Sequence, residues 1–181
     1  GQVMKRIFVL MMGLALAGLA PRAAAHEGEP DHGEPGLSDA AAGNVVVASV
    51  VVQGTVAARK AELYQLERWP QVFSDARSLK RNADGTWTVD FLRFGHPHDF
   101  RVTRTPGGVV FELAARDHGE ARLEYALEPV DALRSRLTIR LVASTPPQLT
   151  AAQMTSMLRA KAQSDLDDFS KRAGARRVEG T

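Results

Sequence analysis

Residues 137–169 read LTIRLVASTPPQLTAAQMTSMLRAKAQSDLDDF, and their hydrophobic period changes partway along. Leu137, Ile139 and Leu141 alternate with polar residues, a period of two that predicts a strand with one apolar face. Pro146-Pro147 ends this pattern. The apolar residues that follow recur at helical spacing: Met154, Leu158, Ala162, Leu166 and Phe169. The stretch therefore predicts the last strand of a sheet, followed by a long helix whose apolar stripe can cover that sheet.

Ordinary start and stop residues mark the two ends of this helix. We expect it to begin at Thr150 and to end near Ala173, because Gly174 is typical of a helix C-terminus. Residues 176–181 then form a short tail.

The alternating pattern also extends backward from the helix to about residue 72. Turn signals divide it into short strands, and the clearest of them is Asp84-Gly85. Such a pattern is typical of an antiparallel meander with one wet face and one apolar face. The positions expected on the apolar face are Trp87, Phe91, Phe100, Phe111, Leu123, Tyr125, Leu137 and Ile139.

The chain before the meander contains one predicted strand and one predicted helix. Residues 44–53, NVVVASVVVQ, are a β-branched run between two glycines, which predicts a strand. The valines occupy both faces, which indicates a strand covered on both sides. Thr55 is a suitable cap for a helix over about residues 56–67, and Trp69-Pro70 is expected to end that helix.

The N-terminal segment has the three parts of a secretory signal. Lys5 and Arg6 precede an uncharged apolar run from Ile7 to Ala20, and Ala23-Ala24-Ala25 supplies a small-residue cleavage pattern. The run is shorter than the roughly 20 apolar residues of a membrane-spanning helix, which argues against an uncleaved anchor. We therefore predict a signal peptide at residues 1–25 and export, to the periplasm or the medium, after cleavage near Ala25.

The composition excludes several classes of function. The chain of 181 residues has no cysteine, so it has no disulfide, thiolate metal ligand, cysteine nucleophile or lipoprotein anchor. Its formal net charge is +2, but residues 1–25 contain three basic residues and no acidic one. The remaining chain has a net charge of −1, which removes the electrostatic case for binding nucleic acid.

Residues 26–43, HEGEPDHGEPGLSDAAAG, contain almost no large apolar side chain. Such a segment cannot bury enough surface to offset its ordering entropy, so we interpret it as a flexible linker. His26 and His32, with the carboxylates around them, are potential ligands for copper or zinc. Their spacing matches no closed metal site, so we assign no metal ligand and no cofactor.

The predicted order is a strand, a helical segment, about six antiparallel strands and one long C-terminal helix. This α+β order resembles the START-like helix-grip superfamily, also called SRPBCC, over about residues 44–175. Residues 67–73, ERWPQVF, resemble the family segment that joins the short helices to the second strand, and Pro146-Pro147 resembles the family sequence before the long helix. The resemblance implies a curved sheet of about seven strands wrapped around that helix, with an apolar cavity between them. A shared fold does not fix a shared function.

The resemblance turns the apolar-face residues into candidate ligand contacts. Tyr125 is expected to hold a polar group of the ligand, and Arg93 to pair with a ligand carboxylate or phosphate. The alternatives are a Tyr125 hydroxyl that reaches solvent or backbone, an Arg93 salt bridge at the sheet edge, and a filled core without a cavity. The predicted ligand-binding residues are Trp87, Phe91, Arg93, Phe100, Phe111, Tyr125, Ile139, Met154 and Leu158.

The hypothesis that follows is an exported, soluble, monomeric carrier or sensor that binds a hydrophobic small molecule or lipid and makes transient contact with membranes. The long helix, or the turn at residues 95–98, is expected to act as its gate. One alternative is a cyclase- or hydrolase-like enzyme of the same fold, with His96, His98, Asp99 and His118 as acid–base candidates. Neighbouring strand residues point to opposite faces, so we assign no catalytic residue to that set. The other alternative is a non-enzymatic interaction module with a metal-binding N-terminus.

Overall fold

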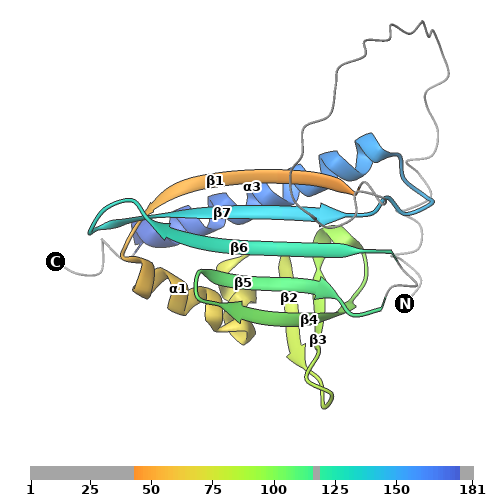
Figure 1. Ribbon diagram of the computed structural model, residues 1–181, viewed down its shortest axis with the longest axis horizontal. Coiled ribbons are helices and arrows are strands. Elements are labelled where there is room, and N and C mark those ends of the chain that lie inside the picture. The colour runs from red at the N-terminus through yellow and green to blue at the C-terminus, as the bar shows by residue number, and fades with distance from the viewer. Residues whose placement is uncertain (1–42, 116–118, 176–181) are drawn as a thin grey trace, which may run out of the picture. The chain divides into compact units, whose positions relative to one another are not determined.

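The computed structural model describes residues 43–115 and 119–175. The predicted signal peptide at 1–25, the linker up to residue 42 and the tail at 176–181 lie outside the described residues. The elements follow in the order β1 (Asn44–Gln53), α1 (Val56–Tyr64), the 3₁₀ turn η1 (Leu66–Arg68), α2 (Trp69–Val72), β2 (Ala76–Arg81), β3 (Trp87–Phe91), the 3₁₀ turn η2 (Leu92–Phe94), β4 (His98–Thr105), β5 (Gly108–Leu113), β6 (Ala121–Pro129), β7 (Arg134–Ala143) and α3 (Ala151–Ala175) (Figure 1).

The seven strands form one antiparallel sheet in the order β1-β7-β6-β5-β4-β3-β2. Strands β2 to β7 form the expected meander, and β1 pairs with β7 from Asn44↔Ala143 to Gln53↔Arg134. Strands β1, β7 and β6 run across the view of Figure 1, whereas β2 and β3 run steeply down it, so the sheet is strongly twisted. The predicted fold class, a curved seven-stranded sheet with a long C-terminal helix, is confirmed.

Helix α3 covers the apolar face of the sheet and packs mainly against β1 and β7. Its predicted apolar stripe is buried from Met154 to Phe169, which confirms the assignment made from helical spacing. The helix continues to Ala175, so the expectation that Gly174 would end it is wrong. No helix in the described part of the chain is long and apolar enough to cross a membrane.

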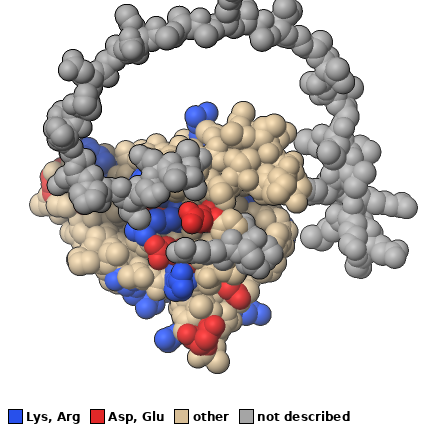
Figure 2. All heavy atoms as spheres, turned by 45° about the vertical axis from the view of Figure 1, so that its right-hand side comes forward, with Lys and Arg blue, Asp and Glu red and all other residues tan. Residues whose placement is uncertain are grey.

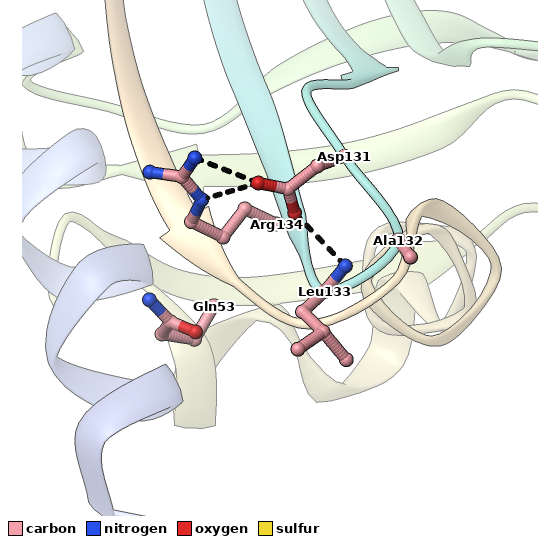
Figure 3. A pocket seen from close by; sticks show the side chains of 5 residues that line it. All are labelled: Gln53, Asp131, Ala132, Leu133 and Arg134. Carbon is pink, nitrogen blue, oxygen red and sulfur yellow. Dashed lines mark hydrogen bonds and ion pairs between the residues drawn. The ribbon is translucent and has the colours of Figure 1, made fainter.

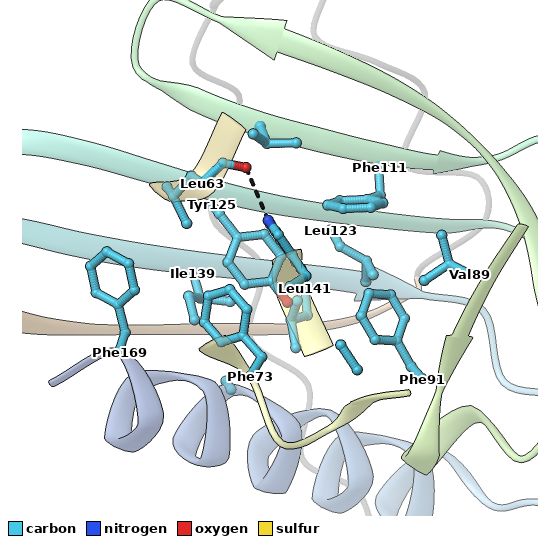
Figure 4. Packing of buried hydrophobic residues seen from close by; sticks show 14 of the residues in the cluster. Leu63, Phe73, Val89, Phe91, Phe111, Leu123, Tyr125, Ile139, Leu141 and Phe169 are labelled. Atoms are coloured by element: carbon cyan, nitrogen blue, oxygen red, sulfur yellow. Dashed lines mark hydrogen bonds between the residues drawn. The ribbon is translucent and has the colours of Figure 1, made fainter. Parts of the chain in front are cut away.

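Aromatic side chains fill the space between the sheet and α3 (Figure 4). Trp69 lies at their centre, with its ring 4.9 Å from that of Phe111 and 4.9 Å from that of Tyr125. Its indole Nε1 donates a hydrogen bond of 2.9 Å to the carbonyl oxygen of Leu63, which satisfies the polar atom of a fully buried side chain. The inner face of the sheet is therefore in direct contact with packed side chains.

The helical segment after β1 is divided differently from the prediction. Thr55 does cap α1, because its hydroxyl accepts from the amide of Ala58. The helix ends at Tyr64, however, and Trp69-Pro70 begins α2 rather than ending α1. Proline lacks an amide hydrogen, which is no loss in the first turn of a helix, so Pro70 fits there.

Strand β1 is covered on one face only, so the prediction of two covered faces is wrong. It is the edge strand of the sheet, and α3 packs against its inner face. The outward side chains of Val45 and Val47 are 50% and 60% exposed. A run of valines has no alternation, and hydrophobic period alone cannot separate an edge strand from a central one.

The outer face of the sheet carries charges of both signs. Arg136 pairs with Glu128 at 2.9 Å, and Arg122 lies between Glu112 and Glu124. On the face drawn in Figure 2, basic and acidic side chains are interspersed. This mixture gives the outer face no strong field of one sign.

Replacing Leu158 by alanine tests the packing of α3 on the sheet. Leu158 is fully buried, so we expect Leu158→Ala to lower the free energy of unfolding by about 2–5 kcal/mol through lost apolar burial and a cavity. Leu133 is 72% exposed, and we expect the matched variant Leu133→Ala to change it by less than about 0.5 kcal/mol. Urea unfolding of both variants measures the difference, and equal effects would contradict the described packing.

Candidate functional site

A chain of hydrogen-bonded polar side chains crosses the apolar core beneath α3. The Tyr125 hydroxyl donates to Asp165 Oδ2 over 2.7 Å, and Lys161 Nζ donates to the same oxygen over 3.1 Å. Lys161 Nζ also donates to Asp75 Oδ2 over 2.7 Å. Arg93 donates to Asp75 Oδ1 over 2.9 Å and completes the chain. We call these five residues the buried polar chain.

Four separate elements bring the buried polar chain together. Lys161 and Asp165 lie one turn apart on the covered face of α3, and Tyr125 points inward from β6. Asp75 lies in the turn between α2 and β2, and Arg93 lies in η2, which follows β3. The amide of Leu92 donates to the carbonyl oxygen of Asp75 over 2.7 Å, so this bond holds η2 against the turn.

Most of the buried polar chain is inaccessible to solvent. The side chains of Lys161 and Asp75 are 0% exposed, whereas that of Arg93 is 31% exposed. Lys161 Nζ also lies 3.8 Å from the centroid of the Phe91 ring, a cation–π contact. The carboxylates of Asp75 and Asp165 balance the cations of Lys161 and Arg93, so the buried polar chain has no net charge when Tyr125 is neutral. Buried ions lose much hydration, so this arrangement is costly unless each partner is present.

The two carboxyl groups respond to burial in opposite ways. For Asp75, burial acts to raise the pKa, but Lys161 and Arg93 together hold the pKa below its ordinary value of 3.8. For Asp165, burial dominates over Lys161 and Tyr125, so its pKa is raised. Burial, and then the charge of Asp165, raise the pKa of Tyr125 well above 10, so its hydroxyl keeps its proton.

One acceptor of the buried polar chain is unused. Asp165 Oδ2 accepts two hydrogen bonds, but Asp165 Oδ1 is buried and has no hydrogen-bond partner among the described residues. A carboxylate oxygen in this state keeps its full desolvation cost. The arrangement can therefore accept one further hydrogen bond in the core.

A surface hollow of about 420 Å³ lies over the outer end of the chain, where Arg93 is partly exposed. Lys161, Asp165 and Asp75 are direct sequence neighbours of residues in its wall. It is lined by Ser74, Arg93, Ala160, Gln163, Ser164, Asp167, Asp168 and Lys171.

Polar contacts close the boundary between α3 and the turn that contains Asp75. Asp168 Oδ2 accepts from the amide and the hydroxyl of Ser74, over 2.8 and 2.6 Å. Arg172 donates to the carbonyl oxygen of Gln71 over 2.9 Å. We call these contacts, between Ser74 and Asp168 and between Gln71 and Arg172, the polar seam. The seam and the bond from Lys161 to Asp75 join α3 to the residues around α2.

A second hollow, of about 250 Å³, lies at the β6–β7 turn (Figure 3). Gln53, Ala132 and Leu133 line it, together with Asp131 and Arg134. Asp131 Oδ2 accepts from Arg134 Nε over 2.7 Å, and Asp131 Oδ1 accepts from the amide of Leu133. Its polar groups therefore satisfy one another, and we do not regard it as a ligand site.

Packed side chains fill the space where an apolar cavity was expected, so the alternative of a filled core describes this conformation, and most of the predicted ligand contacts are buried there. Phe91 lies 6.3 Å from Phe100 and 5.9 Å from Phe111, ring to ring. The two hollows are at the surface, and Arg93 is the one predicted contact that lines either of them. The predicted contacts that are buried in the core are Trp87, Phe91, Phe100, Phe111, Tyr125, Ile139, Met154 and Leu158.

Tyr125 and Arg93, the two predicted polar anchors, are the ends of the buried polar chain. The alternative of a Tyr125 hydroxyl bonded to solvent or backbone is wrong, because it donates to a carboxylate of α3. Arg93 lies in η2, after β3 ends at Phe91, and it forms a salt bridge with Asp75, as its alternative interpretation proposed.

Three of the acid–base candidates, His96, His98 and Asp99, lie at the turn between η2 and β4 and at the start of β4. The His96 and His98 rings are 4.2 Å apart, and His96 is exposed. Asp99 accepts from the Thr88 hydroxyl over 2.6 Å. His118 lies outside the described residues, and within them no group of three or more histidines and carboxylates could hold a metal ion.

Asp75, Lys161 and Asp165 were not predicted. Two of them were detectable, because Lys161 follows Met154 by seven residues and Asp165 follows Leu158 by seven. Residues seven apart lie on the same face of a helix, so both charges fall on the buried stripe. Nothing in the local sequence marks Asp75, whose burial depends on contacts distant in the chain.

Comparison with solved structures identifies the class of fold. The described chain is similar to a START superfamily protein from Mycobacterium smegmatis, with a TM-score of 0.63, 14% identity and coverage of 74% of this chain and 99% of that one. It is also similar to the Zhui aromatase/cyclase from Streptomyces sp. R1128, with a TM-score of 0.56, 15% identity and coverage of 73% and 94%.

A third similar structure is the di-domain aromatase/cyclase StfQ from the steffimycin biosynthetic pathway, with a TM-score of 0.56 and 16% identity. The match covers 75% of this chain and 52% of that one. No protein-family model matches the sequence, and no curated protein matches it. The chain has the START-like, or SRPBCC, helix-grip fold, as the sequence pattern predicted.

Lys161→Met tests the central ion pair. The variant leaves the carboxylates of Asp75 and Asp165 buried without their shared cation, so we expect a loss of about 3–5 kcal/mol in the free energy of unfolding. Lys171 lies on the same helix and is exposed, and Lys171→Met is expected to change the free energy by less than about 0.5 kcal/mol. Denaturant unfolding at neutral pH checks both, and a Lys161→Met protein as stable as wild type would refute the description.

Asp165→Asn tests the raised pKa of Asp165. Between the ordinary pKa of 3.8 and the raised value, the native chain holds a proton that the unfolded chain releases. The free energy of unfolding of the wild-type protein therefore decreases as the pH rises through that interval. Asp165→Asn cannot titrate at this position, so its free energy of unfolding does not show this decrease.

The stability of Asp165→Asn relative to wild type should accordingly increase as the pH rises above about 3.8. Urea unfolding at a series of pH values measures this difference. A difference between Asp165→Asn and wild type that stays constant as the pH rises would show that the pKa of Asp165 is not raised.

Proposed function

We propose that this protein binds an apolar small molecule or lipid between the sheet and α3, as a carrier or sensor. The observation that carries the proposal is the buried polar chain, which runs from a surface hollow to Tyr125 through an aromatic core. Apolar residues of similar volume often make a protein as stable as buried ions do, or more stable. A contribution to stability therefore does not by itself explain why the core contains the buried polar chain. Ligand sites combine apolar walls with a few placed polar groups, which is the composition found here.

The described conformation is the closed state in this proposal, because side chains occupy the space between sheet and helix. The ligand gains access when α3 separates from the chain around α2. Helix α3 packs extensively on β1 and β7, whereas the polar seam holds its other side through a few exchangeable contacts. The hollow beside Arg93 marks the outer end of this path. As the seam opens, water can replace its hydrogen bonds and can hydrate Lys161 and Asp75 as their ion pair separates, whereas lifting α3 from β1 would expose apolar surface.

The comparisons support the proposal at the level of fold. Two of the similar structures are described as aromatase/cyclases. At 15–16% identity their activities do not transfer to this chain. Binding without an assigned reaction is the function that the fold and the buried polar chain support together.

Export is the second part of the proposal, and it rests on the signal pattern in residues 5–25. Expression of the whole sequence in a Gram-negative host should yield periplasmic protein whose first residue is His26. Intact-mass measurement of the periplasmic fraction checks this. Protein that stays in the cytoplasm with residues 1–25 attached would contradict export.

Ligand binding through the polar seam can be tested with the uncharged apolar dye N-phenyl-naphthylamine. We expect saturable fluorescence enhancement with wild-type protein. A Ser74→Cys/Asp168→Cys variant places a thiol on each side of the seam, and the chain contains no other cysteine. The oxidised variant should bind the dye at least about tenfold more weakly than its reduced form, because the seam is then covalently closed.

The reduced form of the same variant is the matched control, and mass spectrometry shows whether the disulfide has formed. Saturable binding that is equal in both forms would exclude the seam as the path. No binding to wild type would contradict the proposed function itself.

A further inference from the structure

We propose that the ligand is an uncharged apolar molecule with a hydroxyl group, and that this hydroxyl donates to Asp165 Oδ1. The inference rests on the proposed function and specifies the chemistry of the ligand at the same site. It follows from the hydrogen-bonding capacity that the buried polar chain leaves unused.

Every other carboxylate oxygen in the buried polar chain already accepts a hydrogen bond. Asp75 uses both oxygens, one for Arg93 and one for Lys161. Asp165 uses Oδ2 twice, for Tyr125 and for Lys161, and leaves Oδ1 without a partner among the described residues. A carboxylate oxygen only accepts, so the group that satisfies it must be a donor.

Charge balance selects a neutral donor over an ionised one. The two cations of the chain already match its two carboxylates. An ammonium group would add an uncompensated positive charge in a sealed core, and a carboxylate would place a negative charge beside Asp165. A hydroxyl group can donate a hydrogen bond to Asp165 Oδ1 without changing the net charge.

The surroundings of Asp165 require the rest of the ligand to be apolar. Tyr125, which bonds Asp165, has ring contacts of 4.9 Å with Trp69 and 5.8 Å with Phe73. Lys161, the other partner of Asp165, lies against the ring of Phe91. A molecule that reaches Oδ1 therefore lies beside side chains that pack against aromatic rings, which favours an aliphatic or aromatic body.

Two isomeric probes test this inference: decanol, which donates and accepts, and methyl nonyl ether, which only accepts. Their affinities are measured by displacement of N-phenyl-naphthylamine from the wild-type protein. Because a hydrogen bond to a charged group contributes about 1.5–3 kcal/mol, we expect decanol to bind at least about tenfold more tightly than the ether. Decylamine and decanoate, measured in the same way, are expected to bind more weakly than decanol.

Asp165→Asn shows whether Asp165 is the acceptor. The asparagine oxygen faces the donors Tyr125 and Lys161, which turns the amide NH₂ toward the position of Oδ1. That group donates equally to an alcohol and to an ether, so the preference for decanol should fall to less than about twofold. In the control Glu128→Gln, which alters an exposed carboxyl group on the outer face of the sheet, the preference should stay as in wild type.

The possible outcomes separate the two proposals. Equal binding of decanol and ether by wild type, or tighter binding of decanoate or decylamine, overturns the hydroxyl inference and leaves the proposed function in place. A preference for decanol that persists in Asp165→Asn assigns the acceptor elsewhere and also overturns it. Absence of dye binding to wild type removes the proposed function and the inference together. If Asp165→Asn does not fold, the wild-type ratio of decanol to ether affinity still tests whether the ligand donates a hydrogen bond.

Discussion

The ion pair between Lys161 and Asp75 is the contact on which the rest of the site depends. Helix α3 lies on β1 and β7 through apolar packing, but Lys161 joins it to the turn after α2, on the other side of the core. The same ammonium group positions Asp165, which in turn holds Tyr125. A single buried cation therefore fixes the relation between the helix, the turn and the central sheet. Its cost in desolvation is also the reason to look for a role beyond stability.

Hydrophobic period predicted the fold because each element contacts the core through one face. Leu137, Ile139 and Leu141 alternate, and each is buried on β7 as that alternation requires. The valines of β1 do not alternate, and there the pattern gave the wrong environment. The position of Pro70 was also predicted wrongly. A proline can follow the end of one helix or lie in the first turn of the next, and Pro70 lies in the first turn of α2.

The candidate site was harder to predict, because its members are defined by partners distant in the sequence. Tyr125 was selected correctly, since a buried hydroxyl needs a partner, but that partner lies 40 residues later in the chain. Lys161 and Asp165 occupy core positions of α3, and a search for apolar residues on that face passes over them. Asp75 is an ordinary turn residue in sequence, and it is buried because η2 and α3 close over it.

The pairing of β1 with β7 has a consequence for how the chain folds. Asn44 pairs with Ala143, so the first strand must wait until nearly one hundred later residues are available before it can join the sheet. Contacts between such distant segments make folding slow, because the loop must close before any favourable contact forms. Until then β1 presents an uncharged, valine-rich edge that can pair with other chains. Since β1 is made first and pairs with the last strand of the sheet, it stays unpaired for longer during synthesis than the other strands of the described chain.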